Sequence, residues 1–481
     1  MKKRKKLSYK KDQQRKQQRA SKAISLLKQY SIKQWLELIR KLNINHNKFN
    51  DINNKIRTKP EFLVVVTDFA IRVSKNNINY YNPNIEQIYY LLTSEIELAD
   101  GPQNIIKLFG VGGLPFLATW QNRFNYAQTN MLGRLHLLYK HYNTYLIENI
   151  SLSIEDMYII LLAILGVYRN KDMIYFRKED IASDDISNLT TEKINNFLEY
   201  FSKNQDNYIK KAKSDKIYEK SFGKFKYLIR YPIVEIESNL YIVPVFEQLI
   251  DTVSNNLYFL LLESFAKKDR NESKKFLDEF GLILENYVLN LARNPFGIKK
   301  VLDANRIVKN KNESRCEAVI IHKKKALAIE VKKMYFKRDS IEQMDKEHID
   351  DLLEKHIVKA YQQIENTLNY LCYEKYFGLI VIPDIMIGLS TIKTYLKNKF
   401  KDLARFDESV FICTLSSYEA LMANTDDNIF LILEHVKERK FNDGDDINMV
   451  ISEMINGGAD IKMKNEFLIK ESDKSIELLV K

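Results

Sequence analysis

The chain contains few residues that interrupt regular secondary structure: 14 Gly and 8 Pro occur among its 481 residues. Gly and Pro are the residues that most often end helices and strands, so this sequence favours helices over the many short turns of an all-β protein. Apolar residues make up 45% of the chain, which is enough to build hydrophobic cores. We therefore expect a largely helical protein, and its length predicts about two to four domains.

The positive charge is concentrated at the N-terminus. Residues 1–22 hold eleven Lys or Arg and one acid, which leaves only +2 of the net charge of +12 for the rest of the chain. This basic tail is predicted to be disordered, and it either binds phosphates non-specifically or only keeps the protein soluble. A second basic stretch, 208–231, is either a nucleic-acid surface or a half-buried strand through Phe225, Tyr227 and Ile229.

Cysteine usage and hydropathy indicate the compartment. The three cysteines lie far apart and form no Cys-x-x-Cys pair, so neither a disulfide scaffold nor a cysteine-built zinc site is expected. No apolar run reaches the ~20 residues that a membrane-spanning helix needs, and no secretory signal follows the basic start. We expect a reduced, soluble, cytoplasmic protein that does not contact a membrane.

The order of predicted elements divides the chain. Helical spacing dominates the first part, short strands begin near Ile233, and a mixed order of helices and strands follows Asn271. The expected organisation is a basic disordered tail (1–22), a helical domain (23–215), a connector made of a β-hairpin and a helix (216–271), an α/β domain (272–425) and a C-terminal extension (426–481).

Charged residues interrupt two apolar strands of the expected α/β domain. Residues 316–321 and 326–331 predict an antiparallel hairpin, with Glu317 in the first strand and Glu330 in the second. Strand periodicity places Glu330 and Lys332 on one face. Buried carboxylates are costly unless something compensates them, and an oxygen-preferring divalent cation would do so. The lysine would then orient or deprotonate an attacking water, as metal-assisted phosphodiester hydrolysis requires.

An acidic residue on one strand followed by Glu-x-Lys on the next resembles the signature of the PD-(D/E)XK nuclease superfamily. The resemblance covers about residues 272–425, with Glu317 standing where Asp is usual. It implies a restriction-endonuclease-like mixed-sheet αβββαβ core after the helical N-terminal region. It also implies a glutamate on the preceding helix, which Glu285 matches, and a glutamine on the following helix, for which Gln363 is a better candidate than Gln362.

The resemblance implies a nuclease that depends on Mg²⁺ or Mn²⁺ and cleaves nucleic acid, DNA in most members. Glu317, Glu330 and the carbonyl of Val331 would hold the metal, Lys332 would act on the water, and Glu285 and Gln363 would support the site. A defence role against phages or a role in a mobile element fits a nuclease attached to a helical region, which would in turn bind a protein partner or a second copy. Substrate phosphates would contact the basic residues Lys333, Lys337 and Arg338.

Other interpretations stay open. Glu330 and Lys332 could form an exposed ion pair on a surface strand, although the apolar flanks argue against that. The chain could also be a non-catalytic nucleic-acid-binding or helical interaction protein that retains a degenerate nuclease fold. Among the histidines, His322 is expected to lie exposed in the hairpin turn, whereas His348 and His356 belong to a polar helix face.

Overall fold

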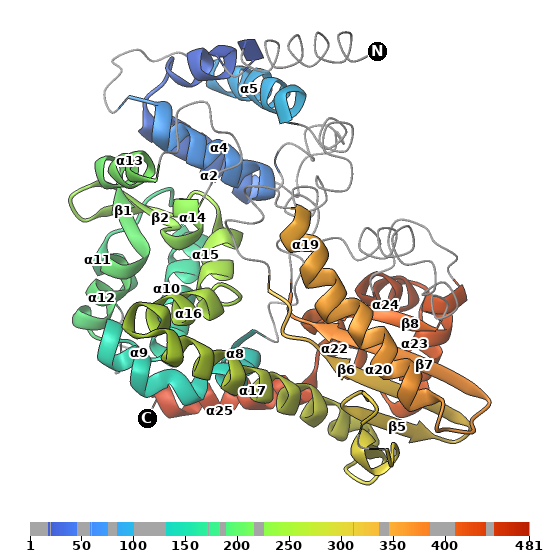
Figure 1. Ribbon diagram of the computed structural model, residues 1–481. Helices are drawn as coiled ribbons and strands as arrows, with labels where there is room; N and C mark the ends of the chain where they lie inside the picture. Colours follow the sequence, from blue (N-terminus) through green and yellow to red (C-terminus); the bar gives the residue numbers. More distant parts are fainter. Residues whose placement is uncertain are drawn as a thin grey trace, which may run out of the picture. The chain divides into compact units, whose positions relative to one another are not determined.

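The computed structural model shows a mixed α/β protein with two compact units (Figure 1). The first unit comprises residues 1–120, 143–257 and 479–481, and the second comprises 121–142 and 258–478. The division at residue 257 lies inside the segment that the sequence analysis treats as a connector. The structure describes residues 18–19, 21–45, 58, 60–75, 84–100, 131–171, 173–182, 189–215, 226–310, 312–335, 346–384, 409–438 and 447–480.

The first unit is mainly helical and contains a small mixed sheet of order β1-β2-β3, in which β1 and β2 run parallel and β2 and β3 antiparallel. Its elements are α2 (Ile32–Asn45), α4 (Pro60–Val73), α5 (Ile85–Asp100), α9 (Asn143–Ile150), α10 (Ile154–Lys171), α11 (Lys178–Ile181), α12 (Thr191–Phe201), β1 (Ser202–Asn204), α13 (Gln205–Ser214), α14 (Lys226–Arg230), β2 (Ile233–Glu237), β3 (Leu240–Ile242) and α15 (Phe246–Val253).

The hairpin β2–β3 confirms the two strands predicted near residues 233–245. Asn239 in its turn has a φ of 59°, a left-handed conformation that Asn tolerates better than most residues. The half-buried strand predicted through Tyr227 and Ile229 is wrong, because helix α14 occupies these positions. Tyr227, Leu228 and Ile229 are all buried, so the alternation along the sequence does not reflect two faces of a strand.

The second unit contains a five-stranded mixed sheet of order β4-β5-β6-β7-β8. The first three strands pair antiparallel, and β7 and β8 continue parallel to β6. The elements are α8 (Met131–Tyr139), η4 (Lys140–Tyr142), α16 (Leu257–Lys268), α17 (Arg270–Phe296), β4 (Val301–Asp303), η5 (Ala304–Arg306), β5 (Ala318–His322), β6 (Lys325–Val331), α19 (Lys346–Leu353), the π-helical turn η6 (Glu354–Val358), α20 (Lys359–Leu368), β7 (Lys375–Ile382), β8 (Val410–Thr414), α22 (Leu415–Leu421), α23 (Asp426–Glu438), α24 (Ile447–Asn456) and α25 (Glu466–Val480).

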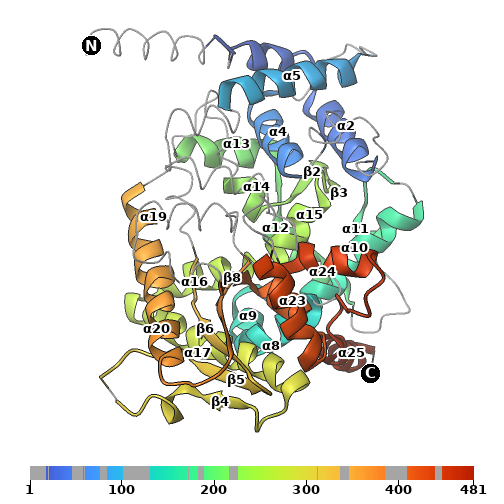
Figure 2. The same ribbon diagram turned by 90° about the vertical axis from the view of Figure 1, so that its right-hand side faces the viewer.

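Helices cover both faces of this sheet (Figure 2). On one face, Gly378 of β7 leaves room for Ile364 of α20, and a Cβ at this glycine would lie 2.8 Å from the isoleucine side chain. On the other face, the neighbouring Phe377 packs against Phe430 of α23, with ring centroids 5.9 Å apart. Side chains alternate along a strand, so Gly378 and its β6 partner Ala328 face α20. Glu330, two residues beyond Ala328, faces α20 as well.

The sequence locates several elements of the second unit. The helix expected to carry Glu285 is α17, and the hairpin expected from residues 316–321 and 326–331 is formed by β5 and β6. Strands β7 and β8 complete the sheet beyond β6. Strand β4 is not predicted, because three residues are too few for a periodic pattern.

A buried ion-pair network joins α8 to the C-terminal part of this unit. Glu419 of α22 is fully buried, and both of its oxygens accept hydrogen bonds from Arg134, at 2.5 and 2.8 Å. Tyr287 donates to the same carboxylate at 2.5 Å. Arg134 also pairs with Asp384. The guanidinium therefore fixes α8, although this helix is separated in sequence from the rest of the unit.

Within the described residues, no single helix is long and apolar enough to cross a membrane. Two segments, Met131–Ile150 and Ile154–Tyr168, meet the length and composition test only when they are combined across a sharp bend.

We predict that Arg134→Met destabilises the protein by about 3–5 kcal/mol, because it leaves the buried Glu419 carboxylate without its cation. Urea denaturation followed by circular dichroism measures this loss. Lys474→Ala, which removes an exposed ion pair with Glu471, serves as the control and should leave the midpoint unchanged. An Arg134→Met midpoint equal to that of the wild type would contradict a structural role for the network.

Candidate metal and catalytic site

Glu330 lies near the end of β6 and is fully buried, with 0% of its surface exposed. One carboxylate oxygen, Oε1, accepts a hydrogen bond from Lys332 Nζ. The other oxygen, Oε2, is also buried but has no hydrogen-bond partner among the described residues. An unsatisfied buried carboxylate oxygen costs free energy, so this atom is where a bound cation would stabilise the fold.

Glu317 lies at a bend immediately before β5, not within the strand as predicted from the sequence. Its backbone still pairs with β6, because Glu317 N–H donates to the carbonyl of Ile329 at 3.0 Å. Because Ile329 directly precedes Glu330 on β6, this hydrogen bond places Glu317 next to Glu330. The Glu317 carbonyl also accepts a hydrogen bond from the backbone N–H of Ala304 at 3.3 Å, just after β4 has ended.

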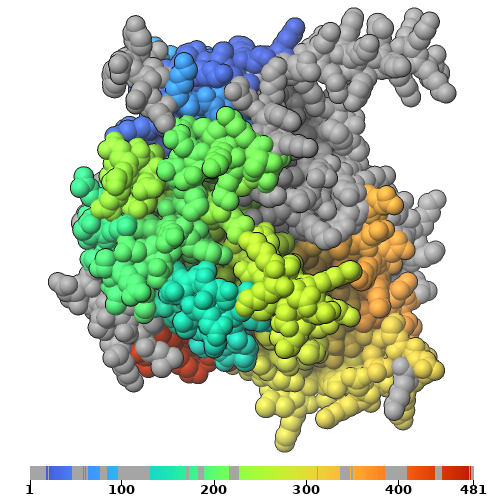
Figure 3. Space-filling view, turned by 60° about the vertical axis from the view of Figure 1, so that its left-hand side comes forward, coloured from blue at the N-terminus to red at the C-terminus, as the bar shows by residue number. Residues whose placement is uncertain are grey.

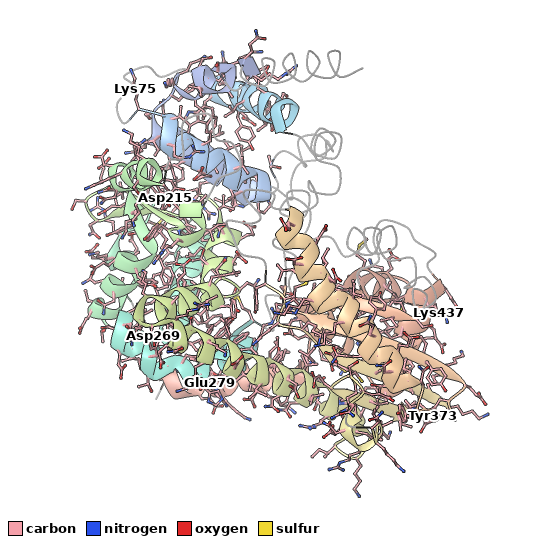
Figure 4. The ribbon with its side chains drawn as sticks, viewed as in Figure 1. Lys75, Asp215, Asp269, Glu279, Tyr373 and Lys437 are labelled. Carbon is pink, nitrogen blue, oxygen red and sulfur yellow. The ribbon has the colours of Figure 1, made fainter. Side chains whose placement is uncertain are left out.

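Glu285 comes from α17, the helix that also carries Glu279, which Figure 4 labels. It is half-buried, and it is near enough to Glu317 and Glu330 to raise the pKa values of both carboxyls by charge repulsion. A helix, a bend and a strand thus bring three carboxyl groups together. The structure therefore places these three predicted site residues near one another.

Burial is the main cause of the pKa shifts in the cluster. It raises the pKa of Glu330 to about 7, against the opposing attraction of Lys332. Burial also raises the pKa of Glu317, and repulsion from Glu330 and Glu285 adds to the effect. Because the neighbouring acids resist full ionisation together, the cluster favours either bound protons or a bound cation.

Lys332 and Gln363 are held in a chain of hydrogen bonds. Lys332 N–H pairs with the carbonyl of Val381 at 2.9 Å, so its backbone continues the pairing of β6 with β7. Its ammonium donates to Glu330 and, at 2.7 Å, to Gln363 Oε1. Gln363 Nε2 in turn donates to the carbonyl of Arg315 at 2.8 Å. The glutamine is therefore oriented by backbone, and it orients the lysine beside the carboxylates.

Of the three basic residues that were predicted to contact substrate phosphates, the structure describes Lys333. Lys333 donates to the carbonyl of Leu277 on α17, and its Nζ lies 3.7 Å from Asp278. Burial lowers the pKa of this lysine. It therefore contacts α17, while Lys337 and Arg338 lie outside the described residues.

Three residues beside the site were not predicted from the sequence. They are Lys355, His356 and Lys359. His356 is half-buried and lies near the charges of Lys355, Lys359, Lys332 and Lys333. Burial and these lysines lower the pKa of His356 to about 4, so the imidazole is neutral at pH 7. The charge of Lys359 also opposes the rise in the pKa of Glu330. Lys355, Lys359 and Gln363 recur every four residues, a helical spacing that could have placed them on one face.

A second group of candidate ligands lies at the hairpin turn. His322 is buried, not exposed as expected, and its ring nitrogens lie 2.8 Å from Asp427 and 3.1 Å from Asp426. The ligand atoms of the three residues all lie within 4.8 Å of one another. Lys323 and Lys300 already pair with the two aspartates, at 2.6 and 2.9 Å. The two lysines therefore already neutralise the aspartates, and these ion pairs stabilise the start of α23.

We predict that Glu330→Gln stabilises the metal-free protein at pH 8 and has little effect at pH 5. The folded-state pKa of about 7 lies above the unfolded value of 4.5, so stability falls as pH rises through this interval. Glutamine mimics the protonated acid. The melting temperature of the Glu330→Gln variant at pH 8 in EDTA should therefore exceed that of the wild type by roughly 2–6 °C.

The matched control is Glu434→Gln, because Lys325 and Lys375 lower the pKa of Glu434. That substitution should lower the melting temperature at pH 8. A lower melting temperature for Glu330→Gln at pH 8 would show that the carboxylate is already compensated within the protein.

Comparisons of this chain with protein-family models, with curated proteins and with solved structures find no match.

Proposed function

We propose that the second unit is a metal-dependent nuclease that hydrolyses phosphodiester bonds of nucleic acid, with DNA as its substrate. The observation that carries the proposal is the buried Glu330, whose Oε2 has no partner among the described residues although two further acids lie beside it. Such a cluster is unfavourable by itself and favourable around a divalent cation.

The arrangement of the unit supports the proposal. Apart from the short turn η5 and the segments α19 and η6 that precede α20, the elements run in the order α17, β4, β5, β6, α20, β7. This order matches the helix, three strands, helix and strand that the resemblance implies. The mixed sheet places the Glu-x-Lys residues at the end of its central strand, β6. The choice of DNA over RNA rests on the resemblance alone.

The residues present fit a Mg²⁺ or Mn²⁺ ion. Glu317 and Glu330, together with the Val331 carbonyl, would supply the oxygen ligands that these metals prefer. Such an ion supplies Lewis-acid polarisation of the phosphate and a more acidic water. Glu285 would add negative charge beside the ligands and help to hold the cation.

Lys332 and Gln363 would act on the substrate side of the site. The ammonium is positioned by Glu330 and Gln363, so little reorganisation is needed when negative charge develops on the phosphate. The same group can orient the attacking water or take part in its deprotonation. Gln363 is a positioning residue, because it acts through Lys332.

We predict that Glu330→Gln and Lys332→Ala each reduce metal-dependent cleavage by roughly 100-fold or more. Plasmid, linear duplex and single-stranded DNA, and RNA, should be incubated with the protein in Mg²⁺, Mn²⁺ or EDTA. Lys324→Ala, which removes an exposed pair with Glu374, is the control and should cleave like the wild type.

Equal cleavage by the wild type and both site variants would place the chemistry elsewhere. Nucleic-acid binding without cleavage under any of these conditions would favour the alternative, a binding protein with a degenerate nuclease fold. Cleavage of RNA alone would overturn the assignment of DNA while supporting the site.

We predict a role for Lys355 and Lys359 in holding the substrate backbone. Both are exposed, and neither forms an ion pair with a described residue. In the Lys355→Ala/Lys359→Ala variant, DNA affinity measured in EDTA should fall, and the slope of log K against log salt should decrease by about 2.

Lys462→Ala/Lys474→Ala removes the same charge from exposed lysines that pair with acids of α25. This control should retain most of the affinity. Equal losses in the two double variants would mean that net charge, not this helix face, attracts the DNA.

A further inference from the structure

The first unit contains a polar cavity of about 250 Å³. It is open to solvent on one side and is lined by residues of α11, α12, β1, α13 and the β2–β3 hairpin, whose elements are green to yellow-green and reach the surface in Figure 3. The lining residues on which the inference rests are Lys178, Asn195, Glu199, Asn207, Glu235 and Tyr241.

Backbone and side-chain contacts fix the walls of this cavity. Phe176 and Tyr241 exchange two backbone hydrogen bonds of 2.9 Å, and their rings stack with centroids 5.5 Å apart. Asn239, in the hairpin turn, accepts from the backbone N–H of Lys178 and donates to Glu179. The short helix α11 is therefore attached to the hairpin, and Lys178 is held at the rim of the cavity.

Several polar groups of the cavity lack partners within the described part of the chain. Asn195 Oδ1 is buried without a hydrogen bond. Tyr241 is only 5% exposed, and its hydroxyl forms no hydrogen bond with a described residue. A buried polar atom normally has a partner, so Asn195 Oδ1 points to a ligand or to ordered water, whereas the Tyr241 hydroxyl is open to the cavity and free to join such a contact.

Opposite charges line the cavity without pairing. Lys178 and Glu235 both face it, yet neither forms an ion pair with a described residue. Lys203 is engaged elsewhere, donating to the carbonyl of Glu199 and lying over the ring of Tyr231. A cation and a carboxylate held apart in one cavity match a ligand that carries both charges.

We propose that this cavity binds a small zwitterion of the α-amino-acid class. The ligand carboxylate would pair with Lys178, its ammonium with Glu235, and Asn195 Oδ1 would accept a hydrogen bond from it. The two glutamates disfavour a nucleotide or another phosphate-rich ligand. The volume lies below the ~300 Å³ at which pockets for drug-sized molecules begin, which suits a molecule of amino-acid size.

Isothermal titration calorimetry of the full-length protein with each of the twenty common L-amino acids tests the proposal. Adenosine and AMP serve as neutral and anionic comparison probes. We expect at least one amino acid to bind with a dissociation constant between about 10 µM and 1 mM. Lys178→Met and Glu235→Gln should each weaken that binding by roughly tenfold or more, since each removes a charged partner.

Two further variants separate recognition from folding. Tyr241→Phe retains the stacked ring and removes only the hydroxyl, and it should weaken binding while its melting temperature stays close to that of the wild type. Lys210→Met, an exposed lysine of α13 outside the cavity, should bind like the wild type. Absence of binding by every amino acid, binding of AMP or adenosine instead, or binding that survives both charge substitutions would overturn the proposal.

Discussion

The second unit is organised around a carboxylate that its own side chains satisfy only in part. Glu330 lies in the central strand of the sheet with no exposed surface, where an ionised carboxylate is unfavourable. Lys332, oriented by Gln363, compensates one oxygen, and the second oxygen has no partner among the described residues. Glu317 and Glu285 add negative charge beside it. A divalent cation would resolve all of these costs at once.

Glu419 differs from Glu330 in how its charge is compensated. Glu419 is equally buried in the same unit, but Arg134 donates to both of its oxygens and Tyr287 to one. This fully compensated acid stabilises the packing of α8, and it needs no ligand. The cluster at His322 is likewise neutralised by lysines. Among these three acidic clusters, the one at Glu330 is distinguished by an oxygen left without a partner, which is why the proposed chemistry is assigned there.

Much of the second unit was predictable because its signals are local. The apolar strands with charged interruptions identified β5 and β6, and strand periodicity placed Glu330 and Lys332 together. The bend at Glu317 was not predictable, because the apolar pattern of residues 316–321 continues through this position without a break. The burial of His322 escaped prediction for a similar reason, since its aspartate partners are distant in sequence. Arg134 joins this unit only through tertiary contacts, which no local pattern reports.

The most direct test of the account is metal binding itself. Calorimetric titration of the protein with Mn²⁺ at neutral pH, in buffers of different ionisation enthalpy, measures both the affinity and the protons released. We predict binding with proton release, because the raised pKa of Glu330 leaves this carboxyl partly protonated without metal, and we predict loss of that binding in Glu330→Gln. Binding that is unchanged in the variant, or no binding by the wild type, would contradict the central claim that this carboxylate cluster is a metal site.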